Sequence, residues 1–425
     1  LIYAAANGDQ PTAEFLVEQG ADVNAADTTG MSSLMHAAAN GDQPTAEFLV
    51  EQGADVNAAD TTGMSSLMHA AANGDQPTAE FLVEHGAQVD ATDADGATPF
   101  MWAVTSGNVS LMRYLVDQGA DPDPSGGIHL KELGLSDNKD WFGSTLTAAA
   151  GTGHLSALRF LIEEAGLPVD DKAWSSRDST TATGTTALGW TALRGEDLQI
   201  LSYLLRQGAR VEPDSASIPY AIAAAWGHRD FLSNNEQMVW DLAEAGASVT
   251  SSRNGLSIPH YGAFYGQTAL LAYSLDQESA PNQATRYGGK TPLHGAARNA
   301  EYGRVAESVV LVCFGADASQ RDKEGHSPAD IARGKEDEDY SEELAVFLDD
   351  PSCPVSPLEP GTAERLLEAA PASVQEADQQ PVVRGLLLLR HIFGADSDPF
   401  LEEYRRLREW YDLPVDLRDA SSSSR

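Results

Sequence analysis

Ten histidines, two cysteines and 64 acidic side chains are the residues of this 425-residue chain that could carry chemistry. Metal sites and hydrolase nucleophiles need such residues at short, recognisable spacings. No His-x-Glu, His-Glu-x-x-His, Cys-x-x-Cys or Gly-x-Ser-x-Gly spacing occurs, and there is no 12-residue acidic loop of the calcium-binding kind. The sequence therefore predicts no catalytic, cofactor or metal site, and a chain that is not an enzyme.

The polar residues that stand out have structural interpretations. His36 and His69 occupy one position of two copies of a repeat, and we interpret both as structural. Cys313 lies in an apolar run and is predicted to be a small core residue, whereas Cys353 lies in a Pro-rich stretch. Two cysteines in so long a chain give no disulfide framework and indicate a reducing compartment. The expected location is the cytoplasm, with the nucleus as an alternative.

The chain is strongly acidic, with a formal net charge of −37 from 64 acidic and 27 basic residues. Nucleic acids and anionic membranes are bound largely through Lys and Arg, so neither is an expected partner. No apolar run reaches the roughly 18–20 residues of a membrane span. Two interpretations of the charge stay open: a solvated, self-repelling surface, or a field that steers a basic protein partner. No small-molecule substrate is indicated.

The elements that would position these residues come from a repeat. Residues 7–39 recur letter for letter at 40–72, and a third copy that begins at Asn73 keeps the first 12 residues. A fixed period of this size marks stacked units, none of which can bury its apolar face alone. The period of 33 residues is also visible in the glycines Gly8, Gly41, Gly74 and Gly107.

One unit, residues 27–59, predicts a turn, two helices and a loop. Asp-Thr-Thr-Gly at its start is typical of a turn, and Ser32 is suited to cap the helix that follows. Pro44 fits the first turn of a second helix, because that position needs no N–H donor. Gly53 ends that helix, as glycine commonly does.

The string Gly-x-Ser/Thr-x-Leu-x-x-Ala-Ala-x-x-Gly, followed by Leu-Val-x-x-Gly-Ala-Asp-Val-Asn, resembles the ankyrin repeat. Residues 289–297, Gly-Lys-Thr-Pro-Leu-His-Gly-Ala-Ala, carry the Thr-Pro-Leu-His signature of that family. The resemblance implies an all-α fold, an ankyrin-repeat solenoid of about nine stacked helix-turn-helix units, some of them degenerate. A small C-terminal helical region follows the array.

We expect helices at 362–370, 380–393 and 398–411 in that last region. Apolar residues of the final helix fall on one face, and this stripe either packs on the repeats and its sister helices or binds a partner. The predicted organisation is an ankyrin repeat array at 1–350 with insertions near 124–140 and 171–183, a Pro-rich linker at 351–361, a helical region at 362–415 and a disordered tail at 416–425.

The resemblance implies a non-enzymatic protein-binding scaffold or adaptor that uses the concave face of the array. The alternative is a targeting or substrate-recruiting region of a larger multidomain protein, such as an enzyme, whose N-terminal part is missing here. Carried over position by position, the turn tips and inner helices that would contact a partner are Thr28, Thr29, Met31, Asn40, Thr61, Thr62, Met64, Asn73, Asp95, Ala97, Thr105 and Ser106. Further candidates either carry interface energy or fill the core between units, and they are Trp102, Trp190, Arg194, Trp226 and Tyr261.

Overall fold

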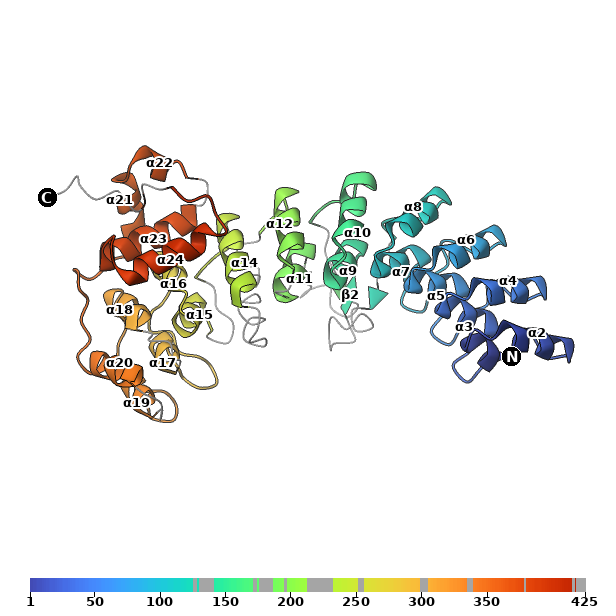
Figure 1. Ribbon diagram of the computed structural model, residues 1–425, viewed down its shortest axis with the longest axis horizontal. Coiled ribbons are helices and arrows are strands. Elements are labelled where there is room, and N and C mark those ends of the chain that lie inside the picture. Colours follow the sequence, from blue (N-terminus) through green and yellow to red (C-terminus); the bar gives the residue numbers. More distant parts are fainter. Residues whose placement is uncertain are drawn as a thin grey trace. The chain divides into compact units, whose positions relative to one another are not determined.

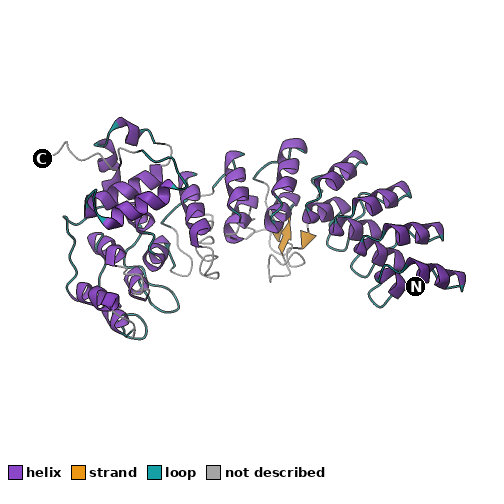
Figure 2. Ribbon diagram, viewed as in Figure 1, coloured by secondary structure: helices purple, strands orange, loops and turns teal. Residues whose placement is uncertain are grey.

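The computed structural model describes residues 1–124, 128–129, 141–170, 174–175, 186–194, 197–211, 232–250, 256–298, 305–334, 339–377, 380–414 and 417. The chain divides into two compact units: unit 1 is Leu1–Thr191 with Gln199–Ala209, and unit 2 is Ala192–Leu198 with Arg210–Arg425. Helices dominate the described part of both units (Figure 1, Figure 2). Within that part, no helix is both long and apolar enough to cross a membrane.

Unit 1 is a stack of helical hairpins (Figure 1), in which the first helices from α1 to α9 contact one another in turn and the second helices from α2 to α8 do the same. We call the first helix of each hairpin inner and the second outer. The inner helices are α1 (Ile2–Ala6), α3 (Ser33–Asn40), α5 (Ser66–Asn73), α7 (Pro99–Ser106) and α9 (Thr145–Thr152). The outer helices are α2 (Gln10–Glu18), α4 (Gln43–Glu51), α6 (Gln76–Glu84), α8 (Val109–Asp117) and α10 (Leu155–Arg159), which continues as a π-helical turn at Phe160–Glu164. Helices α11 (Ala187–Arg194) and α12 (Leu198–Arg206) follow.

The hairpins form where the sequence places caps and apolar stripes. The Ser32 hydroxyl accepts a hydrogen bond from the Met35 N–H at 3.3 Å, so it caps α3 as predicted. Gly41 ends α3 with φ of +68°, a left-handed conformation that glycine adopts without strain. Leu34 and Leu49 of this hairpin are completely buried, which places the core between the two helical layers.

A small antiparallel sheet is the one departure from an all-helical fold among the described residues. Its strands are β1 (Ile128–His129), β2 (Trp141–Gly143) and β3 (Trp174–Ser175), in the order β1-β2-β3. The sequence predicted plain insertions near 124–140 and 171–183, but each contributes a strand that pairs with β2. Trp, Phe and Ile favour strands, and here they stand outside the helical repeat. The rest of both insertions lies outside the described residues.

Unit 2 begins with further helical hairpins. Its inner helices α15 (Ile258–Tyr265), α17 (Pro292–Arg298) and α19 (Pro328–Arg333) contact one another in turn, and α16 (Thr268–Asp276), α18 (Val305–Cys313) and α20 (Asp339–Asp349) follow them. Helix α14 (Leu232–Glu244) precedes them. Because residues 212–231 lie outside the described part, the count of nine repeats stays a prediction.

The C-terminal helices belong to the same compact unit as these hairpins. They are α21 (Thr362–Glu368), α22 (Ala372–Gln375), α23 (Gln380–Phe393) and α24 (Asp398–Arg408), close to the expected positions. Helix α23 packs on α16, and α24 packs on α23 and α16. Phe400 and Leu407 of the predicted stripe are fully buried, so packing within the chain, the first of the two alternatives, accounts for it. Of the predicted disordered tail, only Leu417 is described, and it is buried.

A buried charged cluster fastens α24 to α14. The Arg406 guanidinium forms ion pairs with the carboxylates of Glu236 and Glu403, whose side chains are 0% and 6% exposed. Glu403 also accepts the backbone N–H of Thr268 at 3.1 Å, and Glu236 accepts the indole N–H of Trp240 at 3.2 Å. Burial raises the pKa of Glu236 to about 7, although Arg406 opposes this shift.

The two cysteines correct the sequence analysis. Cys313, at the end of α18, and Cys353 form a disulfide, although the sequence analysis expected none. The sequence could not show that residues 351–358 return to the end of α18, where the Leu358 N–H donates to the Cys313 carbonyl at 2.9 Å. The cysteine-based argument for a reducing compartment was therefore wrong.

The contact between α23 and α16 depends on a glycine. A Cβ at Gly385 would lie 2.6 Å from the Ala269 carbonyl oxygen, whereas a Cβ at Gly295 in α17 would have no neighbour closer than 3.5 Å. We expect Gly385→Ala to destabilise unit 2 by about 1–3 kcal/mol, because the helices must move apart. Gly295→Ala should instead stabilise it by about 0.5–1 kcal/mol, because alanine favours the helix. Urea unfolding compares the two variants, and equal effects of both would contradict this account.

Candidate partner-binding surface

Before the inner helices α3, α5 and α7 of unit 1 the chain forms a tight turn, which we call a finger turn: residues 27–31, 60–64 and 93–97. In the first, the Asp27 Oδ1 atom accepts the N–H groups of Thr29 at 2.8 Å and Met31 at 3.1 Å. Asp60 and Asp93 make the equivalent bonds in the other two. An aspartate that accepts these N–H groups fixes the turn locally, so each finger turn presents its tip in a defined conformation.

Neighbouring finger turns are also bonded to each other. The Thr61 N–H and hydroxyl both donate to the Thr29 carbonyl, at 3.0 and 2.8 Å. The Ala94 N–H donates in the same way to the Thr62 carbonyl at 2.9 Å. Gly30 is required at this contact, because a Cβ there would lie 2.8 Å from the Thr61 nitrogen. The three turns therefore form one continuous ladder.

The second carboxylate oxygen of each finger aspartate is held by the inner helix that follows. His36 Nε2 lies 3.0 Å from Asp27 Oδ2, and His69 Nε2 lies 3.1 Å from Asp60 Oδ2. In the third repeat the indole N–H of Trp102 replaces the imidazole. Burial lowers the pKa of His69, with Asp60 opposing the shift, so the neutral imidazole is favoured. These bonds agree with the structural interpretation of both histidines.

The predicted contact residues of unit 1 differ in exposure. The exposed ones are Thr28, Thr29, Asn40, Thr61, Thr62, Asn73 and Asp95, and the partly exposed ones are Met31, Met64, Thr105 and Ser106. Ala97 and Trp102 are buried. Several of the exposed side chains also hold the scaffold: the Asn40 amide, for example, donates to the Ala6 carbonyl of the preceding hairpin at 2.8 Å. At the exposed tips, the side chains of Thr28 and Asp95 make no hydrogen bond or ion pair with any residue that the structure describes.

Two of the remaining candidates, Trp190 and Tyr261, are not available as direct contacts. Trp190 is 4% exposed and Tyr261 is fully buried, so core filling, the alternative interpretation, describes them and Trp102. The side chain of Arg194 and the whole of Trp226 lie outside the described residues. The sequence shows that these side chains are large and aromatic, but it does not show whether a neighbouring repeat buries them.

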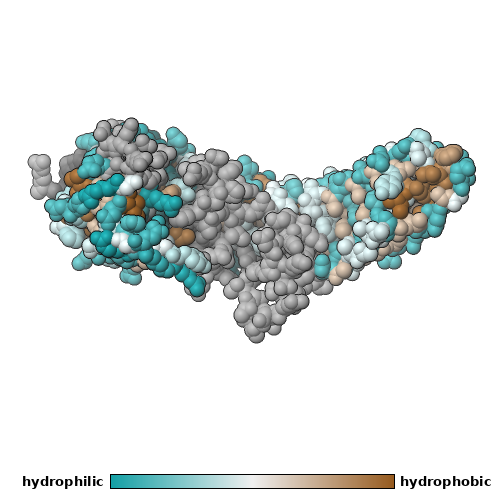
Figure 3. Space-filling model, turned by 90° about the horizontal axis from the view of Figure 1, so that it is seen from below, coloured by the Kyte–Doolittle hydropathy of each residue, from teal (hydrophilic) through white to brown (hydrophobic). Residues whose placement is uncertain are grey.

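The N-terminal repeats carry no cationic side chain other than histidine. The first Lys or Arg of the sequence is Arg113, whereas acidic residues recur in every repeat before it. Figure 3 shows an apolar area at the N-terminal end. Among the apolar side chains of these repeats, Phe15 of α2 is 57% exposed. This region therefore offers a partner acidic and apolar surface.

In unit 2 the finger turns are 285–290 and 322–326, and two histidines fasten them to the inner helices. His260 Nε2 lies 3.0 Å from the Lys290 carbonyl oxygen, and His294 Nε2 lies 3.1 Å from the His326 carbonyl oxygen. His294 Nδ1 lies 2.7 Å from the Thr291 hydroxyl, a bond at the start of α17. Burial lowers the pKa of His260 to about 4 and also lowers the pKa of His294, so both are neutral at neutral pH.

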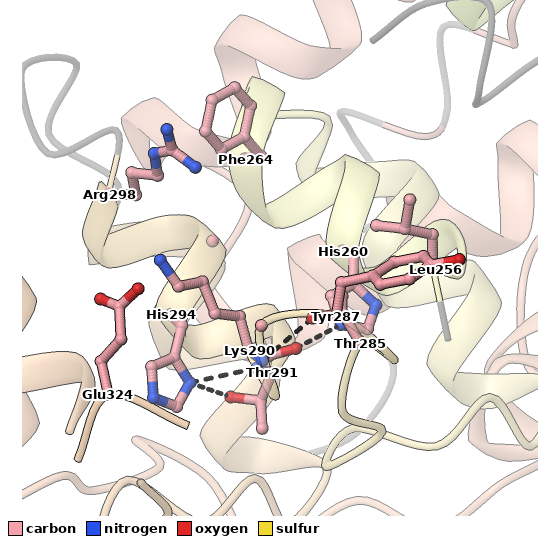
Figure 4. Close-up of a pocket in the computed structure, with 12 residues that line it drawn as sticks. Leu256, His260, Phe264, Thr285, Tyr287, Lys290, Thr291, His294, Arg298 and Glu324 are labelled. Carbon is pink, nitrogen blue, oxygen red and sulfur yellow. Dashed lines mark hydrogen bonds between the residues drawn. The ribbon is translucent and has the colours of Figure 1, made fainter. Parts of the chain in front are cut away.

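Between α15, α17 and these finger turns lies a hollow of about 350 Å³ (Figure 4). We call it the 285–298 hollow. Leu256, Phe264 and Tyr287 give it apolar walls, and Lys290 and Arg298 give it two cations. These side chains were not among the predicted contact residues. The available signal was a Tyr-Gly-Gly-Lys turn directly before the Thr-Pro-Leu-His motif.

Among the described residues, one group of side chains has the composition of metal ligands: Asp322, Glu324 and His326 bring ligand atoms within 4.8 Å of one another. Asp322 Oδ1, however, already accepts the N–H groups of Glu324 and His326, at 2.9 and 3.0 Å. This is the role that Asp27 has in its own finger turn. The geometry is therefore explained by the turn.

The family model described as Ankyrin repeats (3 copies) matches residues 1–60 and 59–126. No curated protein matches the chain. The N-terminal region therefore consists of ankyrin repeats, which mediate protein–protein binding.

Proposed function

We propose that the chain is a non-enzymatic scaffold or adaptor that binds a protein through the finger turns and inner helices of its repeats. The observation that carries the proposal is the ladder of finger turns in unit 1, whose tips are exposed while their backbones are fixed by Asp27, Asp60 and Asp93. A surface that is already ordered loses little conformational entropy when a partner binds.

The partner proposed for unit 1 is a basic protein. Residues before Arg113 contribute aspartates and glutamates but no Lys or Arg, and complementary charge accelerates encounter and selects among partners. Asp95 is the exposed finger carboxylate best placed for a direct ion pair, because Asp27, Asp60 and Asp93 are occupied in their turns. A non-enzymatic role is supported by four histidines whose ring nitrogens are engaged in hydrogen bonds that hold the finger turns: His36, His69, His260 and His294. The alternative, a recruiting region of a larger protein, remains a prediction.

Site-directed photo-crosslinking tests this proposal. A photoreactive amino acid at Thr28 or Asp95 stands on the finger tips, whereas one at Glu18 or Glu51 stands on exposed ends of outer helices. In cell extract we expect discrete protein adducts from the tip positions and about tenfold lower yields from the outer positions. The reason is that a partner bound at the finger tips does not contact the ends of the outer helices. Equal adduct yields from the tip and the outer-helix positions, or no adducts from the tip positions, would contradict the proposal.

A further inference from the structure

The local charge reverses sign at the 285–298 hollow. Residues 279–298 contain Arg286, Lys290 and Arg298 but no Asp or Glu, in a chain whose net charge is −37. The equivalent stretches of unit 1, residues 27–40, 60–73 and 93–106, contain aspartates and no Lys or Arg. Charge of opposite sign on equivalent surfaces indicates that the hollow is not suited to the basic partner proposed for unit 1.

The cations at the hollow are only partly neutralised by the chain itself. Lys290 Nζ lies 4.0 Å from Asp322 Oδ2, and Glu324 lies at the rim. Lys323, from the adjacent finger turn, adds a further positive charge and donates to the Arg286 carbonyl at 2.6 Å. Arg298 is exposed and makes no ion pair with any residue in the described ranges. Among the side chains around the hollow that the structure describes, the balance is four cations against two carboxylates, since both buried histidines are neutral.

The apolar part of the hollow is open and preformed. Tyr287 is 77% exposed at the tip of its finger turn, with the Arg286 guanidinium 5.9 Å from its ring centre. In Figure 4, Tyr287 and Leu256 lie on one side of the hollow, whereas Lys290 extends toward the side on which Arg298 and Glu324 lie. An exposed aromatic residue beside arginines is typical of the residues that dominate binding energy at interfaces.

We propose that the 285–298 hollow binds an extended acidic segment of a partner protein, which inserts an apolar side chain between Tyr287, Leu256 and Phe264 and places a carboxylate against Lys290 and Arg298. Side chains two positions apart point the same way in an extended chain. The segment therefore carries an apolar residue with an aspartate or glutamate two positions away. This inference rests on the proposed protein-binding function and assigns unit 2 a partner segment of opposite charge to that of unit 1.

Binding of short peptides to the full chain tests the inference. The probe is fluorescein-labelled Ser-Glu-Gly-Phe-Gly-Glu-Ser, compared by fluorescence anisotropy with versions in which both Glu are Lys or Gln. We expect the Glu peptide to bind at least about tenfold more tightly than the Lys peptide, and higher salt to weaken it, because the pairs are near the surface. Arg298→Glu should weaken it by about tenfold or more, since the like charge repels. Tyr287→Ala should weaken all three peptides by removing the apolar wall.

Arg405→Glu is the matched control, because it makes the same charge change at an exposed position of α24. It should leave the affinity unchanged, and circular dichroism should show all variants folded. The inference is overturned if the Lys or Gln peptide binds as well as the Glu peptide, if Arg298→Glu has no effect, or if no peptide binds. In each case the photo-crosslinking at Thr28 and Asp95 decides the proposed function separately, since those positions belong to unit 1.

Discussion

Replacing Arg406 with methionine is expected to lower the free energy of unfolding of unit 2 by about 3–5 kcal/mol, the usual cost of removing one partner from a buried ion pair. The substitution leaves Glu236 and Glu403 buried next to each other without their cation. Helix α24 should therefore detach from α14 first. Urea unfolding gives the total loss, and hydrogen exchange followed by mass spectrometry should show faster exchange in α14 and α24.

The size of this loss should depend on pH. The folded-state pKa of Glu236 is raised from 4.5 to about 7. A carboxyl group with a raised pKa contributes stability that is fully present below its unfolded pKa and is lost as the pH rises through the folded value. At about pH 5 the isolated Glu236 of the variant takes up a proton, whereas at about pH 8 it is a buried anion. The Arg406→Met loss should therefore be larger at pH 8.

Arg405→Met provides the control for this prediction, because Arg405 is the exposed neighbour of Arg406 in α24. An exposed substitution of this kind should change the stability by no more than about 0.5 kcal/mol. If both methionine variants unfold at the same urea concentration, or if the Arg406→Met loss is the same at both pH values, the cluster does not fasten α24.

Opening the Cys313–Cys353 disulfide is expected to destabilise unit 2 by about 3–4 kcal/mol, because the bond closes a loop across a sequence separation of 40 residues. Reduction frees residues 351–358 from the end of α18, where the Leu358 N–H otherwise bonds the Cys313 carbonyl. Cys313 is fully buried, so its thiol should remain in the core. The urea midpoint with and without dithiothreitol measures the loss.

Cys353→Ser separates the effect of the bond from side effects of the reductant. The variant should be as unstable without dithiothreitol as the native chain is with it, and dithiothreitol should not lower its stability further. A native chain that is insensitive to reduction, with both thiols shown to be free by alkylation, would contradict the prediction.

Local features of the repeats were predictable because they depend on nearby residues. Ser32, Gly41 and Pro44 define where the helices of one hairpin begin and end, and the structure places α3 and α4 accordingly. The structure confirms the largely helical fold, and the family match confirms the N-terminal ankyrin repeats. The exposed finger tips Thr28 and Thr61 also follow from the turn chemistry, although their role in binding stays a prediction.

Features that depend on contacts between distant residues were not predictable. The pairing of Cys313 with Cys353, the strand contributed by each insertion and the ion pair of Glu236 with Arg406 join residues whose proximity has no local signal. Trp190 and Tyr261 illustrate the same limit, because an aromatic residue fits both a core and an interface. Burial decides between the two, and it requires the neighbouring repeat.

The first two full finger turns and their inner helices are identical in sequence, and the aspartate and histidine bonds of the two turns are the same. A ligand that contacts only the side chains of one turn and its inner helix therefore meets the same residues one repeat further along. Such a complex has two degenerate registers. It gains a statistical factor of RT ln 2, about 0.4 kcal/mol, and exchanges between the two positions without any difference in contact energy. The third finger turn breaks this equivalence with Ala94 and Asp95, so a ligand long enough to reach it occupies a single register.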